Sequence, residues 1–175
     1  MKIGFMGTTT PLLTLEEFQS CYAGKKPYYE YWFGKAIQKS VPTWLHAVLQ
    51  KLLCDVLQEA GYKSAPEVEL RIDPDWQPKP DVIGATNIDE DYPTKPVEIV
   101  AEVLSPEDKM VQVYEKCRQY ERIGIGQIFV FDPNSKTAWM WSCDKTNLER
   151  IAELMLPNGR RIQVQSIWDE LDRRK

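Results

Sequence analysis

The chain has 175 residues, of which 43% are hydrophobic and 27% are charged. These fractions are typical of globular proteins and predict one domain over residues 1–175, long enough to bury an adequate core. The formal net charge of −4 argues against the basic surface that many non-specific nucleic-acid binders carry, although it does not exclude a nuclease.

The sequence shows no membrane-spanning, secretory or cysteine-pair pattern. No apolar run approaches the roughly 20 residues that cross a bilayer, and the N-terminus lacks a basic segment followed by an apolar stretch and a cleavage site. We therefore expect a cytoplasmic protein with no membrane partner. The cysteines show no C-x-x-C spacing, which predicts neither a zinc site nor a disulfide framework but reduced, mostly buried thiols. They are Cys21, Cys54, Cys117 and Cys143.

The first third of the chain is predicted to form a helix, a hairpin and a second helix. Thr14-Leu15-Glu16-Glu17 has the form of a capping box and predicts a helix over residues 15–22. The aromatic residues of 28–33 and a return over 35–41 are typical of a β-hairpin. Apolar side chains at helical spacing predict an amphipathic helix between Thr43 and Gly61.

The middle of the chain alternates strands with polar segments. Strict alternation over 68–73 predicts a half-buried strand, whereas the prolines of 75–80 argue against regular structure. Residues 81–85 are predicted to resume as a strand. Residues 97–104 contain few polar positions, as in a central strand buried on both faces. Ser105 is expected to cap a helix that ends at Gly124.

The last third is predicted to be mainly strand. The segments 127–132, 137–143, 148–155 and 161–165 are apolar or alternating and are separated by turn residues. A short helix is expected to begin at Ser166. The predicted class is therefore α/β (α+β), with a mixed sheet flanked by helices and with an N-terminal helix and hairpin.

Two acids, Asp81 and Glu102, are placed on two short apolar strands. An ionised carboxylate is costly to desolvate unless it has a cation or hydrogen-bond partners, so this pair needs an explanation. A shared divalent cation is the simplest one, because Mg²⁺ is typically held by one or two carboxylates together with waters and a substrate phosphate. The segment therefore suggests phosphoryl-ester chemistry.

A lysine on the helix after the second acid is expected to point toward the same face. Lys109, Val113, Lys116 and Tyr120 form one stripe of that helix, and two of the four are apolar or aromatic. Lys116 is therefore predicted to be half-buried, with its ammonium group directed along the sheet.

Several segments together resemble the Uma-type endonucleases, which belong to the restriction-endonuclease-like PD-(D/E)xK superfamily. The resemblance covers nearly the whole chain. It is carried by Pro80-Asp81-Val82-Ile83, Ala101-Glu102-Val103-Leu104-Ser105-Pro106, Lys116 followed by Tyr120, Gly124, and Phe129-Val130-Phe131-Asp132-Pro133.

The resemblance implies a restriction-endonuclease-like core and a metal site. Asp81, Glu102 and the main-chain carbonyl of Val103 would bind Mg²⁺ or Mn²⁺, which lowers the pKa of a bound water and polarises the scissile phosphate. The superfamily lysine two positions after the second acid is Leu104 here, and Lys116 matches its displaced position on the next helix. It would orient the attacking water or neutralise charge on the phosphoryl oxygens.

Each of these residues also has an ordinary structural explanation. Asp81 could be a turn residue at a strand entry, Glu102 a buried acid paired with a basic residue, and Lys116 a surface lysine. Glu30 is the candidate third acid, or else the cross-strand partner of a hairpin lysine. His46, the single histidine, is more often a capping or surface residue than a peripheral site residue.

Three functions are compatible with these residues. The leading one is a metal-dependent hydrolase, an endonuclease that cuts DNA phosphodiester bonds. A catalytically inactive nuclease-fold module for DNA binding or self-association is the alternative, favoured by the acidic net charge. A hydrolase of a small phosphate ester is the third. A homodimer is expected from the resemblance, because many nucleases of this fold pair to cut both strands.

Overall fold

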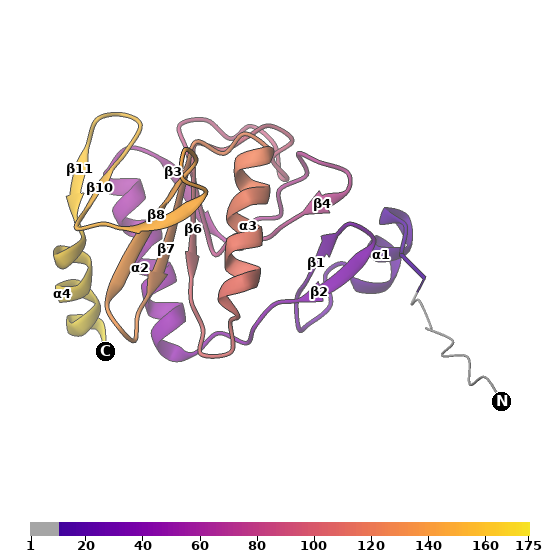
Figure 1. The fold of residues 1–175 in the computed structure, drawn as a ribbon, viewed down its shortest axis with the longest axis horizontal. Helices are drawn as coiled ribbons and strands as arrows, with labels where there is room; N and C mark the ends of the chain where they lie inside the picture. Colours follow the sequence, from indigo (N-terminus) through magenta and orange to yellow (C-terminus); the bar gives the residue numbers. More distant parts are fainter. Residues whose placement is uncertain (1–10) are drawn as a thin grey trace.

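The structure, a computed structural model, describes residues 11–175, so the predicted domain boundary at residue 1 lies outside the described residues. Figure 1 shows a central sheet with helices on both faces and a smaller sheet near the N-terminus. The helices are α1 (Leu15–Tyr22), α2 (Trp44–Glu59), α3 (Met110–Arg122) and α4 (Val164–Arg174). The strands are β1 (Tyr29–Trp32), β2 (Lys35–Gln38), β3 (Lys63–Pro66), β4 (Trp76–Gln77), β5 (Val82–Ala85), β6 (Ile99–Val103), β7 (Gln127–Asp132), β8 (Thr137–Ser142), β9 (Asn147–Arg150), β10 (Glu153–Met155) and β11 (Arg161–Gln163).

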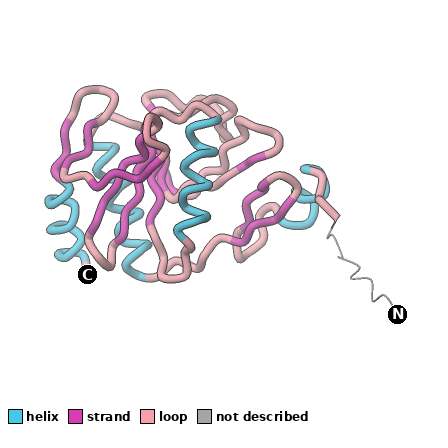
Figure 2. Tube along the Cα trace, in the orientation of Figure 1, coloured by secondary structure: helices cyan, strands magenta, loops and turns pink. Residues whose placement is uncertain are grey.

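The central sheet is mixed, as predicted. Its strand order is β3-β5-β6-β7-β8-β9, and only β6 and β7 run parallel, joined by the crossover through α3. The strands appear together in magenta in Figure 2. A three-stranded antiparallel sheet of order β2-β1-β4 and a two-stranded sheet of β10 and β11 lie outside it. No helix among residues 11–175 is both long enough and apolar enough to cross a membrane.

The two faces of the central sheet pack against different helices. One face packs against α2 and α4 and the other against α3 (Figure 1). Alternation along β6 sends Ala101 and Val103 toward α2 and Val100 toward α3. Glu102 therefore faces α3, the helix that carries Lys116.

The predicted N-terminal elements are confirmed. Thr14 caps α1 with the reciprocal hydrogen bonds of a capping box, in which Glu17 bonds back to the Thr14 main chain. Strands β1 and β2 form the hairpin, with Tyr29 opposite Gln38. The second helix begins after Thr43, whose hydroxyl accepts a hydrogen bond from the main chain of His46.

The strand predicted over 68–73 is wrong. This segment makes isolated hydrogen bonds to loop carbonyls, such as Leu70 to Pro78, in place of a ladder. The edge strand of the central sheet is instead β3 at residues 63–66, which pairs with β5. The alternation of apolar and polar residues led to the wrong prediction. Leu70 is buried in the core although its backbone is irregular, so a buried position here does not indicate a strand.

The proline-rich segment 75–80 is not wholly irregular. Trp76 and Gln77 form the short strand β4, which pairs with Tyr31 and Trp32 of β1. This pairing ties the small sheet to the chain that leads into β5. Pro78 follows β4 directly, as expected where a proline ends a ladder.

Helix α3 begins later than predicted. Ser105 does not cap it, because the Ser105 hydroxyl faces His46 and the Ser105 main-chain N–H donates to the carboxylate of Asp108 at 2.7 Å. A turn over 105–108 results, and the helix starts at Met110 after Lys109, which provides no side-chain cap. The predicted end is close, since the helix stops at Arg122, two residues before Gly124.

Three further predictions need correction. The strand predicted over 148–155 is two strands, β9 and β10. The break lies where the main-chain N–H of Ile151 donates to the Ala138 carbonyl and the Ala152 carbonyl accepts the main-chain N–H of Val164. Helix α4 begins at Val164, two residues before Ser166. The cysteines are only half buried as a group: Cys54 and Cys117 are buried, and Cys21 and Cys143 are exposed.

Gly124 should tolerate alanine poorly. Its φ is +90°, a backbone angle that residues with a side chain rarely adopt. An added Cβ would also lie 3.1 Å from the Pro96 side chain. We expect Gly124→Ala to lower the free energy of unfolding by about 1–2 kcal/mol, measured by urea denaturation. Gly126→Ala is the control, because its Cβ would meet only ordinary contacts with the main chain of Glu98. Equal losses in both variants would contradict this reading.

Candidate active site

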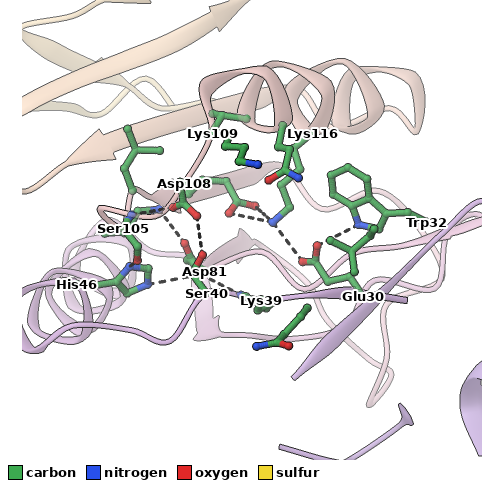
Figure 3. A pocket seen from close by; sticks show the side chains of 17 residues that line it. Glu30, Trp32, Lys39, Ser40, His46, Asp81, Ser105, Asp108, Lys109 and Lys116 are labelled. Carbon is green, nitrogen blue, oxygen red and sulfur yellow. Dashed lines mark hydrogen bonds and ion pairs between the residues drawn. The ribbon is translucent and has the colours of Figure 1, made fainter. Parts of the chain in front are cut away.

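The sheet register places the two predicted acids opposite each other. Val82 pairs with Ala101 in the antiparallel β5–β6 ladder, so the next pair outward is Asp81 and Glu102. Residues directly opposite in an antiparallel pair share a face, with Cβ atoms roughly 4.5–5.5 Å apart. Both side chains line one cavity on the α3 side of the sheet, and Figure 3 shows the residues around it. The predicted convergence of Asp81 and Glu102 is therefore observed.

Asp81 is buried and has partners on both carboxylate oxygens. Its Oδ2 accepts the main-chain N–H of Val103 at 2.8 Å. Its Oδ1 lies 2.9 Å from the Lys39 ammonium and 3.6 Å from Nε2 of His46. Burial acts to raise the pKa of Asp81, but the positive charge of Lys39 holds this pKa well below its usual range. Asp81 is therefore ionised at neutral pH.

Glu102 is bonded to two side chains of α3. Lys116 Nζ lies 3.0 and 3.1 Å from the two carboxylate oxygens, and the Tyr120 hydroxyl donates to Oε1. Burial raises the pKa of Glu102 above its ordinary value, against the lowering effect of Lys116. Burial likewise raises the pKa of Tyr120 well above its ordinary value. Tyr120 therefore acts as a hydrogen-bond donor to Glu102.

Lys116 bridges two acids from different sheets. Besides Glu102, its ammonium contacts Glu30 Oε1 at 3.1 Å, and only 13% of the Lys116 side chain is exposed. Burial acts to lower its pKa, but the carboxylates of Glu102 and Glu30 raise the pKa above its ordinary value. The lysine predicted to be half-buried is thus a fully charged group between two carboxylates.

Glu30 lies in this site and does not pair with a hairpin lysine. It projects from β1, and its Oε2 accepts the indole N–H of Trp32 at 3.0 Å. Its Oε1 accepts the main-chain N–H of Lys79 at 2.8 Å in addition to Lys116. The small N-terminal sheet therefore supplies one wall of the cavity (Figure 3).

His46 is more central than its sequence position indicates. It is buried at the start of α2, where Nδ1 lies 3.0 Å from the hydroxyl of Ser105 while Nε2 faces Asp81. Asp108 extends this series of hydrogen-bonded side chains. Its carboxylate accepts hydrogen bonds from the Ser105 main-chain N–H and from the Ser40 hydroxyl, both at 2.7 Å. The available signal in the sequence was that His46 shares a helix face with apolar residues such as Leu49 and Leu53.

Lys39 is a site residue that the sequence analysis did not identify. It follows β2, and its ammonium reaches Asp81 across 42 residues of sequence. Only 11% of its side chain is exposed. Nothing in its local pattern separates it from Lys35 or the other hairpin cations, so only the packing of the two sheets identifies it.

The donor set of the cavity fits a hard divalent cation. The cavity holds about 90 Å³ and is lined by four carboxylates, those of Glu30, Asp81, Glu102 and Asp108, against the three ammonium groups of Lys39, Lys109 and Lys116. Among residues 11–175 no three His, Cys, Asp or Glu side chains form a ready metal cluster. The expected ligands are two carboxylates and the Val103 carbonyl, a set that Mg²⁺ completes with waters.

Residues 15–171 match the profile of a protein family whose description is "Putative restriction endonuclease", named Uma2. The chain belongs to the Uma2 family. The match spans all four helices to within a few residues and includes every site residue described above. The resemblance seen in the sequence is thus confirmed. Curated protein sequences give no match to this Uma2 chain.

A solved structure shows the same fold. The Uma2 chain superposes on a protein described as a putative nuclease of DUF820 from Anabaena variabilis ATCC 29413, with a TM-score of 0.74 and 18% identity over 91% of this chain and 99% of that one. The predicted nuclease-type fold is therefore observed. A complex of DrdV with DNA aligns with a TM-score of 0.42 and 16% identity, over 71% of this chain and 10% of that one.

Proposed function

We propose that this chain is a metal-dependent endonuclease that hydrolyses DNA phosphodiester bonds. One observation carries the proposal: Asp81 and Glu102 lie opposite each other in the sheet, and Lys116 reaches Glu102 in the same buried cavity. The family description and the nuclease fold support the reaction class. The family description, "Putative restriction endonuclease", favours DNA over a small phosphate ester as the substrate.

The proposed roles follow from the position of each group. Asp81, Glu102 and the carbonyl of Val103 would hold Mg²⁺ or Mn²⁺. When bound, the cation supplies Lewis acidity toward a phosphate oxygen and lowers the pKa of a coordinated water. Asp81 is suited to this because Val103 and Lys39 keep it ionised. Tyr120 fixes the rotamer of Glu102 through its hydrogen bond.

Lys116 is the proposed catalytic cation. Its ammonium lies at the cavity wall with three donors, and its contacts to Glu102 and Glu30 fix its position before a substrate enters. A phosphate oxygen near Glu102 would therefore meet a positive charge that needs no reorganisation. Glu30 has the proposed role of orienting Lys116, because it contacts the ammonium from the opposite sheet.

The test compares two buried glutamates on plasmid DNA with Mg²⁺ or Mn²⁺. Glu102→Gln is expected to reduce cleavage by at least about 100-fold, because it removes a charge that acts on the reacting centre. Glu69→Gln is the matched control: Glu69 is also buried and paired with two cations, Arg71 and Lys79, but does not line the cavity. It should retain cleavage near the wild-type rate.

Equal cleavage by wild type and Glu102→Gln would reject the proposal. If neither cuts but both retard labelled DNA at low salt, the chain is the binding module that its acidic charge favoured. Hydrolysis of a small phosphate ester without DNA cleavage would support the third candidate. The predicted homodimer and cytoplasmic location stay predictions from the sequence, and sedimentation velocity of the purified chain checks the former.

A further inference from the structure

The Lys39 ammonium has three oxygen neighbours in a largely buried position. It donates hydrogen bonds to the main-chain carbonyl of Lys79 at 2.7 Å and to Asp81 Oδ1 at 2.9 Å. Glu67 Oε1 lies at ion-pair distance, 3.7 Å from the ammonium nitrogen. This is the arrangement of a bound cation, although the cation is attached to the chain.

Lys39 and Val103 contact different oxygens of Asp81. Oδ1 lies 2.9 Å from the Lys39 ammonium, and Oδ2 accepts the main-chain N–H of Val103, a residue of the interior strand β6. A divalent cation that coordinates either oxygen of this carboxylate would therefore lie close to the Lys39 ammonium. Two cations this close repel each other in a poorly solvated space.

Glu67 offers Lys39 a second carboxylate outside the cavity. Its backbone has a φ of +55°, which is uncommon for a residue with a side chain, and its N–H faces the carbonyls of Pro80 and Asp81. The Glu67 side chain is 32% exposed, and its Oε1 lies 3.7 Å from the Lys39 ammonium. Glu67 does not line the cavity.

We propose that Lys39 is a tethered counter-ion that neutralises Asp81 until a divalent cation binds and then transfers to Glu67. The proposal rests on the metal site proposed above. The charges are consistent with it: four acidic side chains and three ammonium groups line the cavity, so departure of Lys39 removes one positive charge from the space that a divalent cation would enter. Lys39 is in this scheme a positioning residue that sets metal affinity.

The test measures Mn²⁺ binding by calorimetry, without DNA. Lys39→Met removes the competing charge and is expected to tighten the Mn²⁺ dissociation constant by at least about tenfold. Lys39→Gln retains a donor toward the Lys79 carbonyl and should show the same direction if the methionine variant folds poorly. Glu67→Gln removes the second carboxylate and is expected to weaken Mn²⁺ binding several-fold.

Lys136→Met is the control. The Lys136 ammonium also forms an ion pair, with Asp172 at 2.5 Å, but neither residue lines the cavity. Its substitution should leave Mn²⁺ affinity unchanged. A lysine that merely supports the structure would weaken Mn²⁺ binding when removed, so a gain in affinity separates the two roles.

The outcomes distinguish this inference from the proposed function. If wild type binds Mn²⁺, and Asp81→Asn abolishes the binding, then equal or weaker binding by both Lys39 variants overturns the inference alone. Unchanged affinity in Glu67→Gln overturns the transfer to Glu67. If neither wild type nor the Lys39 variants bind Mn²⁺, the metal site and the inference both fall. Binding by the Lys39 variants alone would support Lys39 as the competing cation.

Discussion

Replacing Lys116 with methionine is expected to lower the free energy of unfolding by about 3–5 kcal/mol, because it leaves two buried carboxylates without their cation. Glu102 is 7% exposed and Glu30 is 2% exposed, and both contact the same ammonium group. Urea denaturation followed by circular dichroism measures the loss. The same variant should also lose DNA cleavage, since it removes the proposed catalytic charge.

The control for this prediction is Lys109→Met. Lys109 directly precedes α3, lines the cavity and is exposed, so its removal should change stability by less than about 0.5 kcal/mol. Saturating Mn²⁺ should restore part of the stability lost in Lys116→Met, because bound metal neutralises Glu102 and stabilises the folded state by mass action. Similar stability of the two variants would show that Lys116 neutralises neither acid.

Replacing Trp76 with alanine is expected to cost about 3–5 kcal/mol of unfolding free energy. Trp76 is fully buried, and its ring packs edge-on against Tyr120 and Trp32 at centroid distances of 5.0 and 5.9 Å. Tyr120 holds Glu102, so the cavity left by alanine would also loosen the acid. Thermal and urea denaturation test the first effect, and Mn²⁺ affinity tests the second.

Trp76→Phe separates packing from polarity at this position. The Trp76 indole N–H has no hydrogen-bond partner among the described residues, so the phenylalanine substitution breaks no hydrogen bond. Phenylalanine keeps an aromatic ring against Tyr120 and should cost much less than alanine. A phenylalanine variant as unstable as the alanine variant would contradict the view that ring packing dominates.

The acidic pair was predictable because its signal is local. An acid in an apolar strand stands out in the sequence, and the strand period fixes that Glu102 faces away from Ala101 and Val103. Lys116 was predictable for the same reason, since helical spacing places it in line with Val113 and Tyr120 on the buried side of α3.

Glu30 was identified as the candidate third acid, but Lys39 was not identified and the contact of His46 with Asp81 was not predicted, because both depend on packing between distant segments. Lys39 and His46 meet Asp81 only when the small sheet and α2 dock on the central sheet. Local chemistry also misled at the start of α3, where Ser105 has every feature of a cap. Its hydroxyl is directed to His46 instead, which a helix rule cannot anticipate.

The two prolines around Lys79 give this site a conformational-entropy advantage. The Lys79 peptide groups serve both sides of the cavity: the N–H donates to Glu30, and the carbonyl accepts from Lys39. Pro78 and Pro80 restrict the backbone on either side of it, in the unfolded chain as well as the folded one. Little freedom is lost when this segment orders, so the acids and lysines are preorganised before any ligand arrives.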